Sequence, residues 1–131
     1  MLDTDIVSAI LKSPDGTAAE VLKRVAPQNE IGVSIITAAE LRYGTAKKGS
    51  AKLLRNVERL LSALEIYPLL SPADMHYGGI RSELESAGQA IGPNDLLIAA
   101  HAIAIGAVLV TANVKEFARV RGLEIQNWLD P

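Results

Sequence analysis

The fold is decided by a stretch near the C-terminus, NDLLIAAHAIAIGAVLVT at residues 94–111. Its first part, Asp95–Ile105, is apolar on nearly every side except at His101 and ends at a glycine, which is typical of a helix at the centre of a domain. The apolar run Ala107–Thr111 follows directly and predicts a buried strand. A central helix that leads into a buried strand favours an α/β fold with parallel strands.

The same alternation of strand and helix patterns extends over the rest of the chain. Four strands are predicted, at Met1–Asp3, Glu30–Ser34, Ile66–Leu69 and Ala107–Thr111. A possible fifth is an edge strand at Glu124–Asn127. Helices are predicted at Ile6–Lys12, Thr17–Val25, a short segment capped by Thr37, Lys47–Glu65, Ser71–Gly88 and Asp95–Ile105 with Asn94 as its cap. We therefore expect one domain, residues 1–131, with a small, mostly parallel central sheet of four to five strands between two layers of helices.

Composition narrows the classes of protein to consider. The chain has 131 residues, of which 49% are hydrophobic and 21% charged, so it can bury one core. No apolar run approaches the roughly 20 residues of a membrane span, and Asp3 and Asp5 follow Met1 where a secretory signal would be basic and then apolar. We expect a cytoplasmic protein without membrane association. Because cysteine is absent, a metal ion would need oxygen ligands or the two histidines.

Positive charge is concentrated in one segment. Residues 41–59 carry a net charge of +5, from one acid, Glu58, and six bases, Arg42, Lys47, Lys48, Lys52, Arg55 and Arg59. The rest of the chain has a net charge of −7, so a nucleic acid would bind only at a localised basic patch or with the help of metal ions. The alternative is that these bases solvate the outer face of a helix.

Acidic and amide side chains follow the carboxyl ends of the predicted strands, where ligands bind in open α/β sheets. They are Asp3, Asp5, Glu40, Asn94, Asp95, Asn113 and Glu116. Each alone has a structural explanation as a helix cap or first-turn acid. Together, ionised carboxylates from distant segments would repel one another unless a hard cation such as Mg²⁺ or Mn²⁺ neutralised them. The set predicts a metal site.

The order of several motifs resembles that of PIN-domain nucleases, and more closely that of VapC-type toxins of bacterial toxin–antitoxin pairs. These motifs are MLDTDI at residues 1–6, SIITAAELRYG at 34–44, YGGIR at 77–81, IGPNDLLIAAH at 91–101, LVTAN at 109–113, Glu116-Phe117, Gly122-Leu123 and Trp128. Each is weak alone, but they span nearly the whole chain in the same order as in the family.

The resemblance implies a PIN-like fold and an endoribonuclease that depends on Mg²⁺ or Mn²⁺. The catalytic residues that it implies are Asp3, Glu40, Asp95, Asn113 and Glu116, with Asp3 and Asp95 holding the principal metal ion. It also implies a homodimer, a VapB-type antitoxin that covers the acidic pocket, and inhibition of translation by cleavage of RNA, which in many relatives is structured RNA such as a tRNA anticodon loop. Asp5 stands where many such toxins have Asn, and this change adds a negative charge beside the metal. Asn113 stands where other PIN domains have a fourth acid, so the number of metal ions, one or two, stays open.

Two further interpretations of the sequence accompany this one. On the first, Asp3 and Asp5 resemble the nucleophile pair of haloacid-dehalogenase-type phosphatases, although only two residues precede them. On the second, the chain is a PIN module that binds RNA without cleaving it. Whether the chain cleaves RNA or only binds it, we expect the contacts with RNA phosphates to come from Arg42, Lys47, Lys48, Lys52 and Arg55.

Overall fold

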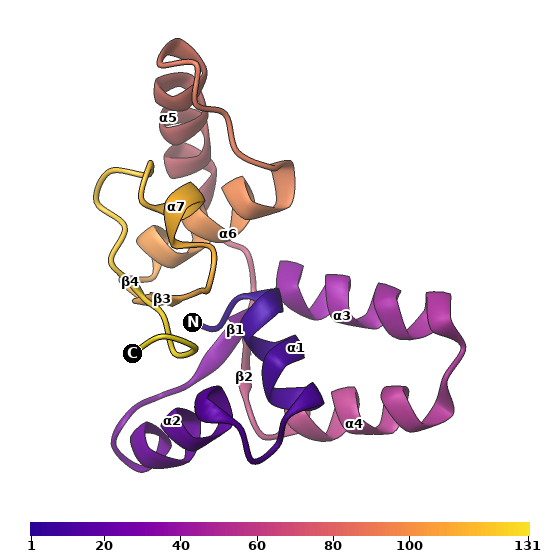
Figure 1. Cartoon of the computed structure of the whole chain (residues 1–131). Coiled ribbons are helices and arrows are strands. Elements are labelled where there is room, and N and C mark those ends of the chain that lie inside the picture. Colours follow the sequence, from indigo (N-terminus) through magenta and orange to yellow (C-terminus); the bar gives the residue numbers. More distant parts are fainter.

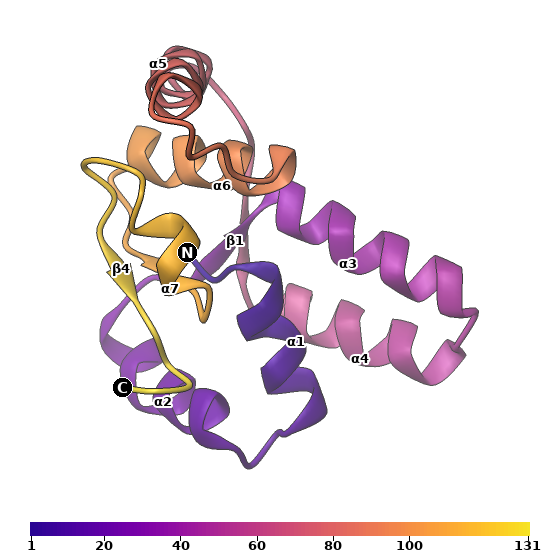
Figure 2. The same cartoon turned by 45° about the horizontal axis from the view of Figure 1, so that its top comes forward.

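The computed structural model describes residues 1–131 and contains seven α-helices, one 3₁₀ helix and four short strands (Figures 1 and 2). In chain order they are α1 (Thr4–Lys12), α2 (Thr17–Val25), η1 (Ala26–Gln28), β1 (Gly32–Ser34), α3 (Ile35–Lys48), α4 (Ala51–Ser62), β2 (Glu65–Tyr67), α5 (Ala73–Ser86), α6 (Pro93–Ala104), β3 (Leu109–Val110), α7 (Val114–Phe117) and β4 (Ile125–Gln126). No helix combines the length and the apolar character that crossing a bilayer requires.

The strands form two parallel pairs, β1 with β2 and β3 with β4. Between the pairs, Leu2 makes single parallel bridges to Val33 of β1 and to Val110 of β3. The predicted α/β class with parallel strands is confirmed, but the predicted sheet of four to five strands is wrong. The N-terminal segment cannot extend as a strand because Asp3, the next residue, is already the N-cap of α1.

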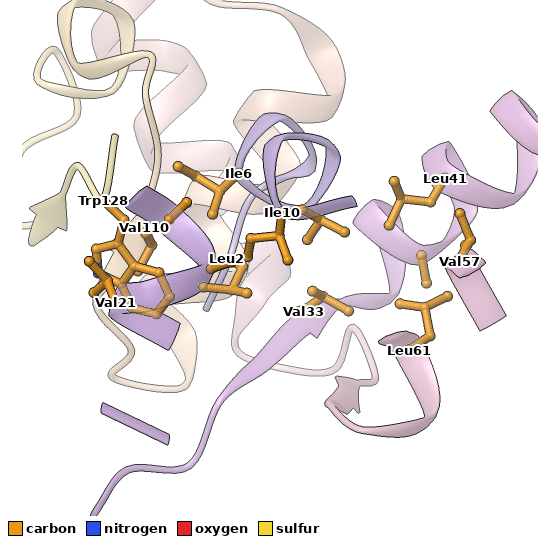
Figure 3. Close-up of a cluster of buried hydrophobic side chains, with 14 residues drawn as sticks. Leu2, Ile6, Ile10, Val21, Val33, Leu41, Val57, Leu61, Val110 and Trp128 are labelled. Carbon is orange, nitrogen blue, oxygen red and sulfur yellow. The ribbon is translucent and has the colours of Figure 1, made fainter. Parts of the chain in front are cut away.

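Hydrophobic side chains form two clusters on opposite sides of the strands. Successive residues of a strand point to opposite faces, so Met1 and Leu109 belong to one cluster and Leu2 and Val110 to the other. The larger cluster has 14 buried residues and joins the strands to α1–α4 (Figure 3). The smaller has nine and joins them to α5, α6 and α7. Helices therefore cover both sides of the strands.

Helices α3 and α4 form an antiparallel hairpin that projects from the strands (Figures 1 and 2). Leu41, Val57 and Leu61 are grouped where the two helices meet (Figure 3). The predictions of a short helix capped by Thr37 and of one helix over Lys47–Glu65 are wrong. Ser34 caps α3, which continues for 14 residues, and the chain then turns at Gly49 before Ser50 caps α4.

The turn between these helices depends on Gly49, whose φ of 64° is in the left-handed region. We expect Gly49→Ala to lower the free energy of unfolding by about 1 kcal/mol, because a Cβ is strained there. The matched control is Gly44→Ala in the interior of α3, where a Cβ would meet nothing within 4 Å. That change should raise the free energy of unfolding by about 0.5–1 kcal/mol. Urea denaturation measures both, and equal effects of the two changes would contradict the role of Gly49.

Candidate active site

The predicted acidic residues come from four segments that the fold brings to one place. Asp3 is the N-cap of α1, Glu40 lies in the first half of α3, Asp95 is in the first turn of α6, and Glu116 belongs to α7. The N-terminal ends of α1, α3 and α6 lie near one another (Figures 1 and 2). Helix α6 begins at Pro93 with Gly92 as its N-cap, so the prediction that Asn94 caps it is wrong.

Asp3 is almost completely buried, with 4% of its surface exposed. Its Oδ1 accepts a hydrogen bond from the Ile6 N–H at 3.0 Å and thereby caps α1. Burial raises the pKa of Asp3, and hydrogen bonds from Thr111 and the Ile6 N–H offset part of this effect. Asp3 is thus a carboxyl group that is fixed in position and costly to ionise.

The Glu40 carboxylate joins three helices. The Thr4 hydroxyl at the start of α1 donates to Glu40 Oε1 at 2.6 Å, and the Asn94 amide of α6 donates to Oε2 over 3.4 Å. Thr4 is not among the site residues that the sequence predicts. The available signal was its place between Asp3 and Asp5, but only the packing of α1 against α3 shows which acid it contacts.

Asp95 and Glu116 form a pair of interacting carboxyl groups. Burial, followed by the charge of Glu116 and then those of Glu40 and Asp3, raises the pKa of Asp95 to about 7. Burial of Glu116 acts to raise its pKa, but hydrogen bonds to its carboxylate outweigh this effect. The donors are the Gly92 N–H at 3.0 Å and the Asn113 side-chain amide. The pKa of Glu116 is therefore below its usual value, and the proton that the pair retains near neutral pH is held on Asp95.

The structure thus brings together all five residues predicted to be catalytic. The side chain of Asp5 is exposed in the first turn of α1. As the side chains are placed, no group of three acidic or histidine side chains is arranged to hold a metal ion. Three of the acids, Asp3, Glu40 and Glu116, instead accept hydrogen bonds from donors of this chain.

The basic residues lie on the hairpin of α3 and α4, outside the acidic cluster. Arg42 forms a bidentate ion pair with Glu58 of α4, with distances of 3.1 and 2.9 Å, which links the two helices of the hairpin. The other four predicted phosphate contacts, Lys47, Lys48, Lys52 and Arg55, are exposed. Lys47 follows Glu40 by seven residues on the same helix, which places it about 10 Å farther along the helix axis.

A buried histidine connects the helices that carry two of the acids. His101 of α6 has no exposed surface, and its Nδ1 lies 2.8 Å from the hydroxyl oxygen of Ser34. That same oxygen accepts from the Ile36 N–H and caps α3. Burial lowers the pKa of His101, so its ring is neutral. The contact links the N-terminus of α3 to the middle of α6.

Comparison with known proteins is consistent with this geometry. Residues 1–123 match the PIN domain family. "Ribonuclease VapC2" of Rickettsia felis is 48% identical over 132 residues, which cover 98% of this chain and 96% of the relative. "tRNA(fMet)-specific endonuclease VapC" of Shigella flexneri is 34% identical over 129 residues, again with 98% and 96% coverage.

A solved structure shows the same fold. It is the crystal structure of VapBC2 from Rickettsia felis bound to a DNA fragment from their promoter, and one of its chains matches with a TM-score of 0.89 and 42% identity. The match covers 98% of this chain and 97% of that one. From the family match and from the identity along nearly the full length, we conclude that this chain belongs to the PIN domain family, within its VapC group.

Proposed function

We propose that this chain is a metal-dependent endoribonuclease and the toxin of a toxin–antitoxin pair. The observation that carries the proposal is the cluster in which Asp95 lies near Asp3, Glu40 and Glu116. Burial and the charges of these neighbours raise the pKa of Asp95 to about 7. Carboxylates from four distant segments are brought together at a cost in repulsion, which is typical of a catalytic site. The similarity to ribonucleases of the VapC group supports RNA as the substrate.

The chemistry of the cluster suits Mg²⁺ or Mn²⁺, because all of its ligand atoms are oxygens and its excess charge is negative. We propose that Asp3 and Asp95 hold the ion, with Glu40, Asn113 and Glu116 beside it. When bound, such a cation offsets the negative charge that develops on the scissile phosphate and lowers the pKa of nearby water. Hydrolysis would leave a 5′-phosphate and a 3′-hydroxyl.

The residues of the chain orient this chemistry. Thr4 and Asn94 hold the two oxygens of Glu40 in place, and the Gly92 N–H and the Asn113 amide do the same for Glu116. Because the pKa of Glu116 lies below its usual value, this carboxylate is ionised near neutral pH and can accept a proton from the attacking water. Asp95 must lose its own proton before it can bind a cation.

The geometry does not favour the phosphatase interpretation. That reaction needs Asp3 as a nucleophile and Asp5 as an acid and base beside it. Asp3 instead caps α1 through Oδ1, and Asp5 is exposed on the helix. The interpretation as a PIN module that binds RNA without cleaving it differs from our proposal in whether the acidic residues support cleavage at all.

The partners that we propose are an RNA, a VapB-type antitoxin and a second copy of the chain. The similar structure from Rickettsia felis is a VapBC complex, which supports the antitoxin. An antitoxin arginine could form bidentate hydrogen bonds with the clustered carboxylates. The name of the relative from Shigella flexneri supports a tRNA as the substrate. Exposed Leu70 and Met75 offer apolar surface for association of two copies.

We expect Asp95→Asn to lower RNA cleavage at least about tenfold, because the amide cannot supply the charge that holds the cation. The measurement is cleavage of total cellular RNA by purified, antitoxin-free protein with Mg²⁺ or Mn²⁺ and with EDTA. The matched control is Asp74→Asn, which removes an exposed acid from the first turn of α5 and should leave cleavage unchanged. Full activity of well-folded Asp95→Asn would remove Asp95 from the mechanism, whereas absence of cleavage by the wild type would support the phosphatase or RNA-binding interpretation.

The rate of cleavage should also depend on pH, and the midpoint of this dependence should shift with the metal concentration. Because the pKa of Asp95 is about 7 without metal, protons compete with the cation for this carboxylate. At limiting Mg²⁺ we expect the rate to rise by about tenfold per pH unit below pH 7 and to level off above it. More Mg²⁺ should move the midpoint to lower pH. A midpoint that does not move with metal concentration would argue against Asp95 as a ligand.

The role of the hairpin is tested by Lys47→Ala combined with Lys48→Ala. If both lysines contact phosphates, RNA binding at low salt becomes weaker and the slope of log affinity against log salt falls by about 1.5. Binding is measured in the Asp95→Asn background so that the RNA stays intact. Lys12→Ala with Lys23→Ala removes two exposed charges elsewhere and serves as the control. Equal slopes in the two double variants would leave the hairpin lysines without a role in binding.

A further inference from the structure

A small cavity lies beside the acidic cluster, between α5 and the segment that leads into α6. Its volume is about 190 Å³. The residues that matter here are Tyr77, Arg81 and Glu85 from α5, Ile91 and Pro93 from the connecting segment, and Leu96 from α6. Most of its lining is apolar, and no part of the mechanism described so far uses it.

One backbone segment, centred on Gly92, lies between the cavity and the acidic cluster. Gly92 donates its N–H to Glu116 at 3.0 Å. A Cβ at this glycine would lie 3.7 Å from Asp95 Oδ2 and 4.0 Å from Glu116 Oε1, so the backbone lies against both carboxylates. Its neighbours Ile91 and Pro93 line the cavity. A group in the cavity is therefore separated from the carboxylates by a single stretch of backbone.

The guanidinium group of Arg81 is held in a defined orientation at this cavity. Its Nε donates to Glu85 Oε1 at 2.8 Å, and its Nη1 donates to the Tyr77 hydroxyl at 3.0 Å. The side chain is 56% exposed, so a ligand can reach it. Because Glu85 compensates its charge and most neighbouring side chains are apolar, the site is poorly suited to a phosphate. A planar guanidinium beside apolar walls suits the face of a nucleobase.

We propose that this cavity is a binding site for one base of the RNA, adjacent to the phosphodiester bond that is cleaved at the acidic cluster. Arg81 stacks on that base, and Tyr77 and Glu85 position Arg81. The inference rests on the proposed ribonuclease function, and it adds a site that selects which phosphate reaches Asp95. Base contacts of this kind are the usual way in which proteins recognise unpaired RNA.

The test uses a short RNA that spans a bond cleaved by the wild-type protein, together with versions in which each flanking nucleotide in turn lacks its base. We expect one abasic position to lower kcat/KM of the wild type by roughly 5- to 150-fold, the range for loss of one stacked base. Arg81→Ala should lower kcat/KM on the intact RNA by a similar factor. On the RNA that is abasic at that position, Arg81→Ala should be as active as the wild type.

Three further variants make the result specific. Arg121→Ala removes an arginine that is paired with Glu83 of α5 at 2.9 Å but does not line the cavity, so it should behave as the wild type on every RNA. Arg81→Lys keeps the charge without the plane and should resemble Arg81→Ala. Tyr77→Phe keeps the ring but removes the hydroxyl that accepts from Arg81, so it should lower kcat/KM on the intact RNA and reduce the abasic penalty.

The possible results separate this inference from the proposed function. If the wild type cleaves no RNA, the proposed function is wrong, and the base site falls with it. If the wild type cleaves in an Asp95-dependent manner but every abasic penalty is the same in Arg81→Ala, only the base site is wrong. Full activity of Arg81→Lys would likewise overturn it, because the contact would then be with a phosphate. Circular dichroism and the melting temperature confirm that each variant is folded.

Discussion

Repulsion among partly buried carboxylates is the constraint on which the rest of this structure depends. Burial, together with the charges of Glu116, Glu40 and Asp3, raises the pKa of Asp95 to about 7. The fold offsets this repulsion with the partial positive charge of helix N-termini and with hydrogen-bond donors. Asp3 caps α1 and Asp95 occupies the first turn of α6, where helix dipoles favour negative charge. Glu40 and Glu116 accept hydrogen bonds from side chains and backbone of distant segments. The ends of the helices, more than the strands, assemble the site.

The short N-terminal segment positions this arrangement between the two halves of the chain. The Leu2 N–H donates to Gly32 of β1 at 2.9 Å, and the Asp3 N–H donates to Val110 of β3 at 2.9 Å. Leu2 has no exposed surface and packs in the larger hydrophobic cluster, while Met1 packs in the smaller one. Because both strand pairs hold this segment, Asp3 has little freedom to move. The two hydrophobic clusters and the site therefore depend on the same three residues.

The sequence predicted the parts of this protein that depend on local pattern. The alternation of elements, the apolar helix α6 and the grouping of acids after strands all follow from periodicity and spacing. Features that depend on the geometry of single residues were not predictable. The break at Gly49 interrupts a pattern that reads as continuous helix, and Asp3 ends the first strand by capping a helix. Pairings such as Thr4 with Glu40 depend on how α1 packs against α3.

Helix α3 carries Glu40 in its first half and Lys47 near its end, and the helix is continuous between them. Its ion pair from Arg42 to Glu58 and its apolar contacts with α4 further oppose bending. Under the proposed function, the helix fixes the distance between the phosphodiester bond that is cleaved and the RNA phosphates that contact Lys47. Its length of about 10 Å between these residues corresponds to about three stacked nucleotides. The minimum footprint of the enzyme on RNA is then a property of one helix, and loop movements leave it unchanged.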